Sequence, residues 1–493
     1  SGNLHYVIAS DAEACPFSLA TPCAETLHYA PMTPRIQRMV ERAWRSYGGP
    51  YEPLQPPFVP AEKDPPLIRS AKAYADSCAR QSVPIHDDEL IVGARPEARY
   101  SDKRVTPQSF GHQTFKPYFA VPDATARFFT EGILSFAGNH TTLDYSTILA
   151  IGFNGLIRRI DRRLKALRGR APDARATRDF LRALRIVAKG YITLCRRYGA
   201  RARQLAGQCG DAARARELRA IATRCRRVAE PPRSFREACQ ALWFAFIFLP
   251  DAPGRVDYLL APYYRRDLAS GAITPDQARE LLGALWIKYF EFMTAGAAVS
   301  AHQHLTLGGT APDGADASNE VTDLCLDVIA DLKLHRPQVG FRWHANMPIE
   351  RLRHAVRTWR AGTGNPDLCN DEQIVPALTK IGVSVEDARD FSLSGCQEVI
   401  VSGRAQMGSV EGFINLPKIV RMALGLEPAL GAGLPRRSGE RSQRRALIPD
   451  TPGVDVDAIA DPGRIGDGPG AGWWIGVAGD LAQIGAYRHV LRS

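Results

Sequence analysis

The stretch that decides the fold is HQHLTLGG at residues 302–309, in which apolar and polar side chains alternate before two glycines. Alternation with a period of two predicts a β-strand, and the glycines predict a turn. Residues 318–332 then begin with the helix-capping sequence Ser-Asn-Glu and keep apolar side chains at helical spacing. The sequence VGFRWH at residues 339–344 predicts a second strand. Strands and helices alternate over residues 300–420, which favours an α/β barrel or a layered α/β sheet.

Upstream of that stretch, the pattern is mainly helical. Thr33 and Pro34 form a cap and a first helical residue, and residues 124–228 keep helical spacing over most of their length. The longest apolar run, residues 241–250, is too short to span a bilayer and predicts a buried helix. Residues 85–93 combine a polar turn with an apolar run, so we expect a short buried strand there.

The composition is that of a globular protein and excludes a disordered or collagen-like chain. The 493 residues include 63 Lys+Arg and 52 Asp+Glu, which gives a net charge of +11. Arginine pairs recur over residues 158–236, and they fit either a nucleic-acid surface or the solvated faces of amphipathic helices. Aromatic side chains do not alternate with these arginines, so we expect the second alternative and no nucleic-acid partner. Since the longest apolar run is too short to span a bilayer, we also expect no membrane partner.

Ten cysteines are dispersed along the chain, and no two lie closer than eight positions. No paired spacing typical of a zinc site is present. Dispersed, unpaired cysteines in a long chain are typical of a reducing compartment, so we expect a cytoplasmic protein.

The sharpest chemical motif is SLSGCQEVI at residues 392–400. If this segment is extended, Cys396 and Glu398 point to the same side, about 7 Å apart, while Gly395 allows an unusual backbone path. A carboxylate disfavours the thiolate that a nucleophilic cysteine needs. The pair therefore fits a sulfur that carries a hydrogen atom and a carboxylate that acts as acid or base. The alternative is a buried cysteine in a β-turn with a solvent-facing glutamate.

The order of motifs over residues 33–425 resembles the glycyl radical enzymes, the family of pyruvate formate-lyase and the B12-independent glycerol dehydratase. No single motif is specific, but many of them stand in the family's order. Besides residues 392–400, they are PRIQR at 34–38, DELIVG at 88–93, NH at 139–140 with DY at 144–145, GRVD at 254–257, LGG at 307–309, DGADASNE at 313–320, GTGNPD at 362–367 and GFINLPK at 412–418.

The resemblance implies a ten-stranded α/β barrel surrounded by helices. It implies that Cys396 forms a thiyl that takes a hydrogen atom from the substrate. It also implies that Glu398, two residues later, is the base of the eliminase branch. The acyltransferase branch uses two adjacent cysteines instead, whereas Gly395 and Gln397 flank the cysteine of this chain. The sequence is therefore similar to the eliminases, which act as lyases or dehydratases.

Three further residues are candidate substrate contacts. His140 and Asp144 match the family's polar pocket in position. Arg342, on the strand predicted at residues 339–344, either lines the pocket or pairs with a buried carboxylate, and the sequence leaves both alternatives open.

The resemblance also implies the cofactor and the partners. The family binds no cofactor but carries a glycyl radical on the protein, installed by a radical-SAM activating enzyme, and acts on a small-molecule substrate, usually as a homodimer. The glycine motif Arg-Val-x-Gly-Tyr is not found in this sequence. We therefore expect an incomplete barrel domain at residues 33–425, between an N-terminal extension at residues 1–32 and a Gly/Pro/Arg-rich tail at residues 426–493.

Two other classes of function are alternatives to a radical lyase. A catalytically inactive homologue or subunit would bind a ligand or a partner without turnover. A zinc hydrolase would use His302, His304, His335 and His344, but no carboxylate completes a zinc-binding motif beside them, and we expect no metal.

Overall fold

The computed structural model describes residues 32–46, 64–93, 99–100, 103–104, 133–136, 140–168, 172–248, 252–294, 304–395, 397–407 and 412–424. The helices are α1 (Pro34–Ser46), α2 (Pro66–Arg80), α5 (Tyr145–Ala166), α6 (Pro172–Gln208), α7 (Ala212–Arg227), α8 (Phe235–Phe248), α9 (Val256–Ala269), α10 (Pro275–Thr294), α11 (Glu320–Leu332), α12 (Ile349–Arg360), α13 (Asp371–Lys380), α14 (Val385–Arg389) and α15 (Leu416–Ala423). The strands are β1 (Arg99–Tyr100), β2 (Lys103–Arg104), β3 (Leu134–Phe136), β4 (His140–Thr141), β5 (Gly254–Arg255), β6 (His304–Gly308), β7 (Gln338–Trp343), β8 (Asp367–Asn370), β9 (Phe391–Ser394), β10 (Glu398–Val401), β11 (Gln406–Met407) and β12 (Gly412–Ile414).

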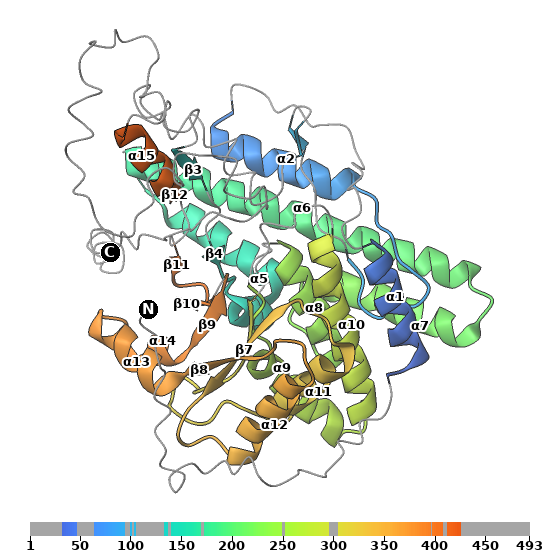
Figure 1. Ribbon diagram of the computed structural model, residues 1–493. Coiled ribbons are helices and arrows are strands. Elements are labelled where there is room, and N and C mark those ends of the chain that lie inside the picture. The colour runs from blue at the N-terminus through green and yellow to red at the C-terminus, as the bar shows by residue number, and fades with distance from the viewer. Residues whose placement is uncertain are drawn as a thin grey trace, which may run out of the picture.

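A four-stranded parallel sheet in the order β5-β6-β7-β8 organises the molecule (Figure 1). Parallel neighbours need long crossover connections, and helices provide them here: α9 and α10 lead from β5 to β6, α11 leads to β7, and α12 leads to β8. The register places Thr306 of β6 opposite Gly340 of β7, and Gly340 opposite Asp367 of β8. The α/β class expected from the alternating pattern is therefore present.

The two faces of this sheet have different neighbours. Leu305 and Leu307 of β6 belong to the main hydrophobic core together with residues of α11. The side chains of His304, which precedes Leu305, and of Thr306, which follows it, point to the other face because strand side chains alternate. There the hairpin of β9 and β10 crosses the sheet, and the backbone N–H of Leu393 donates to Thr306 Oγ1 at 2.8 Å. We call this hairpin side the inner face.

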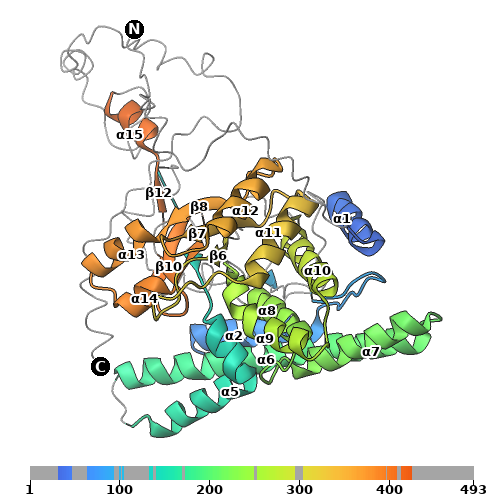
Figure 2. The same cartoon turned by 90° about the horizontal axis from the view of Figure 1, so that it is seen from below.

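A second, helical layer supports the sheet and its crossovers. Helix α6 has 37 residues and contacts α2, α5 and α7 along its length. Figure 2 shows α5, α6 and α7 beneath α8 and α9. None of the described helices is long and apolar enough to cross a bilayer.

Several sequence predictions are confirmed. Strand β6 lies within its predicted stretch, and β7 begins one residue before its own. Helix α11 begins after Asn319, whose side chain accepts a hydrogen bond from the N–H of Val321. Helix α8 is buried along most of its length, as its apolar run predicts. Residues 1–31 and 426–493 lie outside the described residues.

The prediction of a strand at residues 85–93 is wrong. The described backbone there forms turns and no strand. The Gln240 side chain of α8 takes the place of a neighbouring strand: its Oε1 accepts from Val92 N–H at 3.1 Å, and its Nε2 donates to the Val92 carbonyl at 2.7 Å. Trp243 Nε1 donates to the Gly93 carbonyl. Apolar residues can thus be buried here without a sheet, because side chains of a helix satisfy the backbone.

Candidate active site

The motif at residues 392–400 forms a hairpin with a tight turn. Strands β9 and β10 are antiparallel, with Ser394 opposite Glu398. In the three-residue connection, the N–H of Gln397 donates to the Ser394 carbonyl at 3.1 Å. Gly395 and Gln397 have φ angles of 52° and 100°. Cys396 itself lies outside the described residues.

This turn corrects the expectation of an extended segment. Positive φ is uncommon outside glycine, and two such residues in three reverse the chain, so the alternating rule does not relate Cys396 to Glu398. Gly395 takes the unusual path expected of it. The side chain of Glu398 is half-buried, whereas that of Gln397 is exposed.

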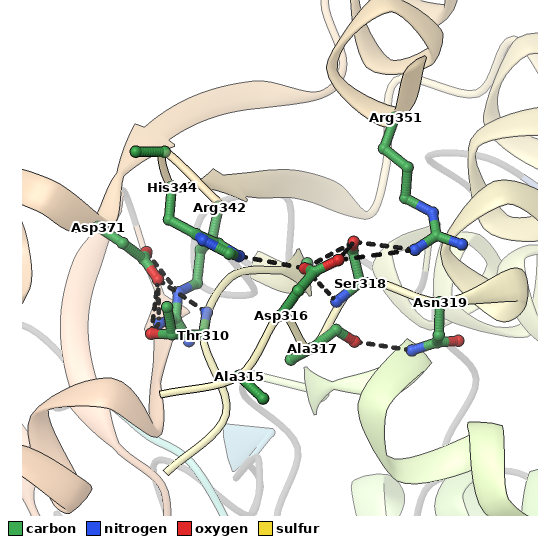
Figure 3. A network of polar contacts seen from close by, with 12 residues as sticks. Thr310, Ala315, Asp316, Ala317, Ser318, Asn319, Arg342, His344, Arg351 and Asp371 are labelled. Carbon is green, nitrogen blue, oxygen red and sulfur yellow. Dashed lines mark hydrogen bonds and ion pairs between the residues drawn. The ribbon is translucent and has the colours of Figure 1, made fainter. Parts of the chain in front are cut away.

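Arg342 of β7 binds the start of this hairpin through hydrogen bonds. Its side chain is completely buried. Nε and Nη2 donate to the two carboxylate oxygens of Asp371 at 2.9 and 2.7 Å, and Nη1 donates to the Phe391 carbonyl at 2.6 Å. Burial lowers the pKa of Arg342 to about 10, with a further decrease from Arg255 and an opposing effect of Asp371. Of the two alternatives left open by the sequence, the structure shows the pairing with a buried carboxylate (Figure 3).

A second buried arginine, Arg255 of β5, was not predicted as part of the site. Its Nη1 donates to Asp390 Oδ1 at 2.9 Å, just before β9, and its Nη2 donates to the carbonyls of Gly308 and Thr310. Both arginines therefore bind the chain next to the first strand of the hairpin. The only sequence signal was its place in the GRVD motif, and that motif does not name a partner.

A polar network continues beyond the strand ends (Figure 3). His344 Nε2 lies 3.1 Å from Asp316 Oδ1, and the same carboxylate accepts from the Ser318 hydroxyl at 2.7 Å. Burial alone would raise the pKa of Asp316, but the hydrogen bonds of His344 and Ser318 lower it. Arg351 Nη1 donates to Ser318 Oγ, which ties α12 to this loop.

His140 and Asp144 reach the hairpin at its other end. Strand β4 pairs with β11, with His140 opposite Met407. Asp144 caps α5 by accepting from the N–H of Thr147 at 2.8 Å, and Gly403 packs directly on it. The length of β10 thus lies between Asp144 and the turn, so the described structure brings Asp144 to the hairpin but not to the turn itself.

The described histidines lie in separate surroundings. His335 packs edge-on against Phe290, and His344 binds Asp316. His304, on the inner face, is completely buried, with Nε2 3.8 Å from Asp367 Oδ2. Within the described ranges no group of three or more His, Cys, Asp or Glu side chains could hold a metal ion. His302 lies outside the described residues.

Comparison with known proteins identifies the family. A family model described as pyruvate formate lyase-like matches residues 120–427. The chain belongs to this family. The resemblance to glycyl radical enzymes of the eliminase branch is confirmed by relatives and solved structures.

The chain covers only part of its pyruvate formate lyase-like relatives. An isethionate sulfite-lyase of Desulfovibrio desulfuricans is 36% identical over 300 residues, which are 57% of this chain and 36% of the relative. A trans-4-hydroxy-L-proline dehydratase of Clostridioides difficile is 31% identical over 373 residues, 71% of this chain and 46% of the relative. The solved B12-independent glycerol dehydratase of Clostridium butyricum superposes with a TM-score of 0.67 at 26% identity, covering 81% of this chain and 58% of that one.

Proposed function

We propose that this chain provides the cysteine-bearing part of a glycyl-radical lyase or dehydratase that acts on a small polar substrate. The observation that carries the proposal is the anchored hairpin. Arg342 and Arg255 bind the chain at the start of β9, and the turn at the other end of that strand bears Cys396. A cysteine on a tight, well-supported turn is the geometry that a positioned reactive group needs.

The chemistry of the neighbouring groups favours hydrogen-atom transfer over nucleophilic attack. Glu398 follows the cysteine by two residues, and a carboxylate opposes formation of the thiolate. When a protein glycyl radical is supplied, it provides the unpaired electron for the Cys396 sulfur. Cys396 then takes a hydrogen atom from a substrate carbon, so that a C–H bond breaks and an S–H bond forms. Glu398 takes or gives a proton while the leaving group departs.

The substrate class follows from the relatives. Their names describe lyases or dehydratases of isethionate, sulfopropanediol and hydroxyproline, and a solved neighbour binds glycerol. Each is a small molecule with a hydroxyl group. We therefore propose a hydroxylated substrate, with His140 and Asp144 as its contacts and Arg342 as the support of the hairpin.

The assembly is part of the proposal. The barrel domain at residues 33–425 would need the remaining strands of a ten-stranded barrel and a radical-bearing glycine, both supplied by a further polypeptide segment. A radical-SAM activating enzyme would install the radical, and we propose a cytoplasmic homodimer.

The test restores a full-length enzyme. Residues 33–425 are joined to the C-terminal part of the D. desulfuricans relative, and the chimera is incubated anaerobically with an activating enzyme and S-adenosylmethionine. An electron paramagnetic resonance signal reports the radical, and isethionate, glycerol and hydroxyproline are the trial substrates. Cys396→Ala should abolish turnover, and Glu398→Gln should lower it by about 100-fold or more with the radical intact.

Matched controls are Cys209→Ala and the exposed Glu386→Gln, which lie outside the hairpin and should leave turnover unchanged. Near-normal turnover by Cys396→Ala would refute the mechanism.

A second candidate function is a non-catalytic subunit that binds a partner. The observation that favours it is α15, where Leu416 and Val420 are 41% and 51% exposed and a neighbouring Ile419 is also exposed. Such an apolar helix face is typical of a surface that another polypeptide covers. A stable, soluble chain that acquires no radical after activation would favour this candidate over the enzyme.

A further inference from the structure

A cavity of about 700 Å³ lies between the start of α2 and the first half of α6. Figure 1 shows these two helices side by side, and they pack against each other. Cavities that bind small molecules typically have volumes of about 300–1,000 Å³. The α2–α6 cavity is therefore large enough to hold a small molecule.

Four arginines of α6 line one wall of this cavity, namely Arg175, Arg178, Arg182 and Arg185. Spacings of three, four and three residues place all four on one side of the helix. Like charges at these spacings repel one another, so an anion bound among them would relieve that repulsion. The arginines of residues 158–236 fit the solvated faces of amphipathic helices in general, but these four gather around a cavity.

Acidic side chains offset only part of this positive charge. Asp64 and Asp179 are the carboxylates among the described lining residues, so two positive charges remain in excess. Asp64 pairs with Lys72 at 2.7 Å, and an oxygen of Asp179 lies 3.8 Å from Arg182 Nη1. Arg175 is exposed and pairs with no acidic side chain among the described residues. The charge of the cavity therefore favours a ligand with about two negative charges.

The remaining described lining residues are apolar. Ile68 is buried in a small hydrophobic cluster with Ala71 and Ala183, and Ile186 packs against the same cluster. Pro65 precedes α2 and forms no side-chain cap hydrogen bond, so the positive end of this helix also borders the cavity. A ligand that fits both kinds of lining has an anionic group and an apolar part.

We propose that the α2–α6 cavity binds a small organic phosphate monoester. A phosphate monoester carries about −1.5 to −2 charge at pH 7, which balances the two excess positive charges. Guanidinium groups bind phosphate through paired hydrogen bonds. The carbon part of the ligand lies on Ile68 and Ile186. The site is independent of the proposed function, because none of its described lining residues belongs to the sheet or to the hairpin.

The experiment uses the full chain and isothermal titration calorimetry at low salt. Phenyl phosphate and inorganic phosphate are the probes. Phenyl phosphate should bind at one saturable site and more tightly than inorganic phosphate, because only its ring can cover the two isoleucines. Its affinity should fall as the pH is lowered from about 7.5 to 5.5, since the phosphate group loses its second charge near pH 6. The double variant Arg175→Gln/Arg182→Gln should weaken binding about tenfold or more, because two charge-assisted hydrogen bonds are lost.

The matched control is Arg216→Gln/Arg219→Gln, which removes the same charge from exposed positions on α7 and should leave the affinity unchanged. If the double variant of α6 does not fold, Arg175→Gln alone is tested, because its side chain is exposed. Equal weakening in the α6 and α7 variants would show attraction by net charge alone and overturn the site. Absence of saturable binding would also overturn it. Binding of a polyglutamate peptide without binding of either phosphate would overturn it in favour of a protein partner.

Discussion

The two ends of the inner face each bury a polar side chain, and the two side chains have different surroundings. Near the carboxyl ends of the strands, Arg342 is fully buried and bound by Asp371 and the Phe391 carbonyl. At the amino end of β6, His304 is equally buried, and its Nε2 lies 3.8 Å from Asp367 Oδ2, which is too far for a hydrogen bond. The buried charge of Arg342 has hydrogen-bond partners that hold the hairpin in place, whereas burial lowers the pKa of His304 and favours its neutral ring. The comparison thus sets a paired, charged arginine at one end against a buried, neutral histidine at the other.

The largest change in the free energy of unfolding is expected at the Arg342–Asp371 pair. Asp371→Ala leaves the Arg342 charge buried without its carboxylate, which typically costs about 3–5 kcal/mol. Urea denaturation should show the decrease in the free energy of unfolding. The matched control is Glu41→Ala, which breaks an exposed pair with Arg45 and should cost less than about 0.5 kcal/mol. Equal losses in the two variants would contradict the supporting role.

Gly340 lies between Arg342 and His304 on the inner face. A methyl group at Gly340 should disturb its two neighbours, Leu393 and His304. Its Cβ would lie 2.1 Å from Leu393 Cδ1. Leu393 is itself buried, so we expect Gly340→Ala to cost about 1–3 kcal/mol by overpacking. Adding Leu393→Ala should recover part of that loss. Gly207→Ala is the control, because nothing lies within 4 Å of its Cβ position. Denaturation curves of all four proteins test the expectation.

His354 provides a paired histidine to compare with His304. Burial alone would lower its pKa, but Asp323 and Asp327 raise it to about 9. The folded state therefore binds a proton more tightly than the unfolded chain, whose histidine titrates near 6.5. The stabilisation is complete below about pH 6.5 and is lost as the pH rises through 9. His354→Gln should cost about 1–2 kcal/mol at pH 6 and close to nothing at pH 10, measured by urea denaturation.

His304 should show the opposite sign with a smaller amplitude. Burial lowers its pKa, so the unfolded chain binds the proton more readily. The wild type should lose stability as the pH falls below about 6.5, and His304→Gln should lack that loss. As the pH falls from about 7.5 to 5.5, the variant should therefore gain stability relative to the wild type, and urea denaturation measures that gain. A difference independent of pH would show that the ring is not held in its neutral form.

Local patterns in the sequence predicted much of the fold around this site. The alternation in β6 and the cap of α11 are signals within a few residues, and both elements formed where expected. The strand expected at residues 85–93 failed because its backbone partner is Gln240, 148 positions along the chain from Val92. The extended segment expected around Cys396 was wrong for a related reason. Gly395 indicates an unusual backbone, but nothing local predicts a positive φ at Gln397.

The sequence by itself determined the family and most of the order of strands and helices, and it is the basis on which we propose Cys396 and Glu398 as the reactive pair, because motifs and periodicity lie in consecutive residues. Only the tertiary structure decided what the buried polar groups do. It paired Arg342 with Asp371, 29 residues away, and it placed His304 Nε2 3.8 Å from Asp367 Oδ2. Contacts of that kind depend on which strands become neighbours and on the space left by a glycine between them, and both arise when the sheet assembles.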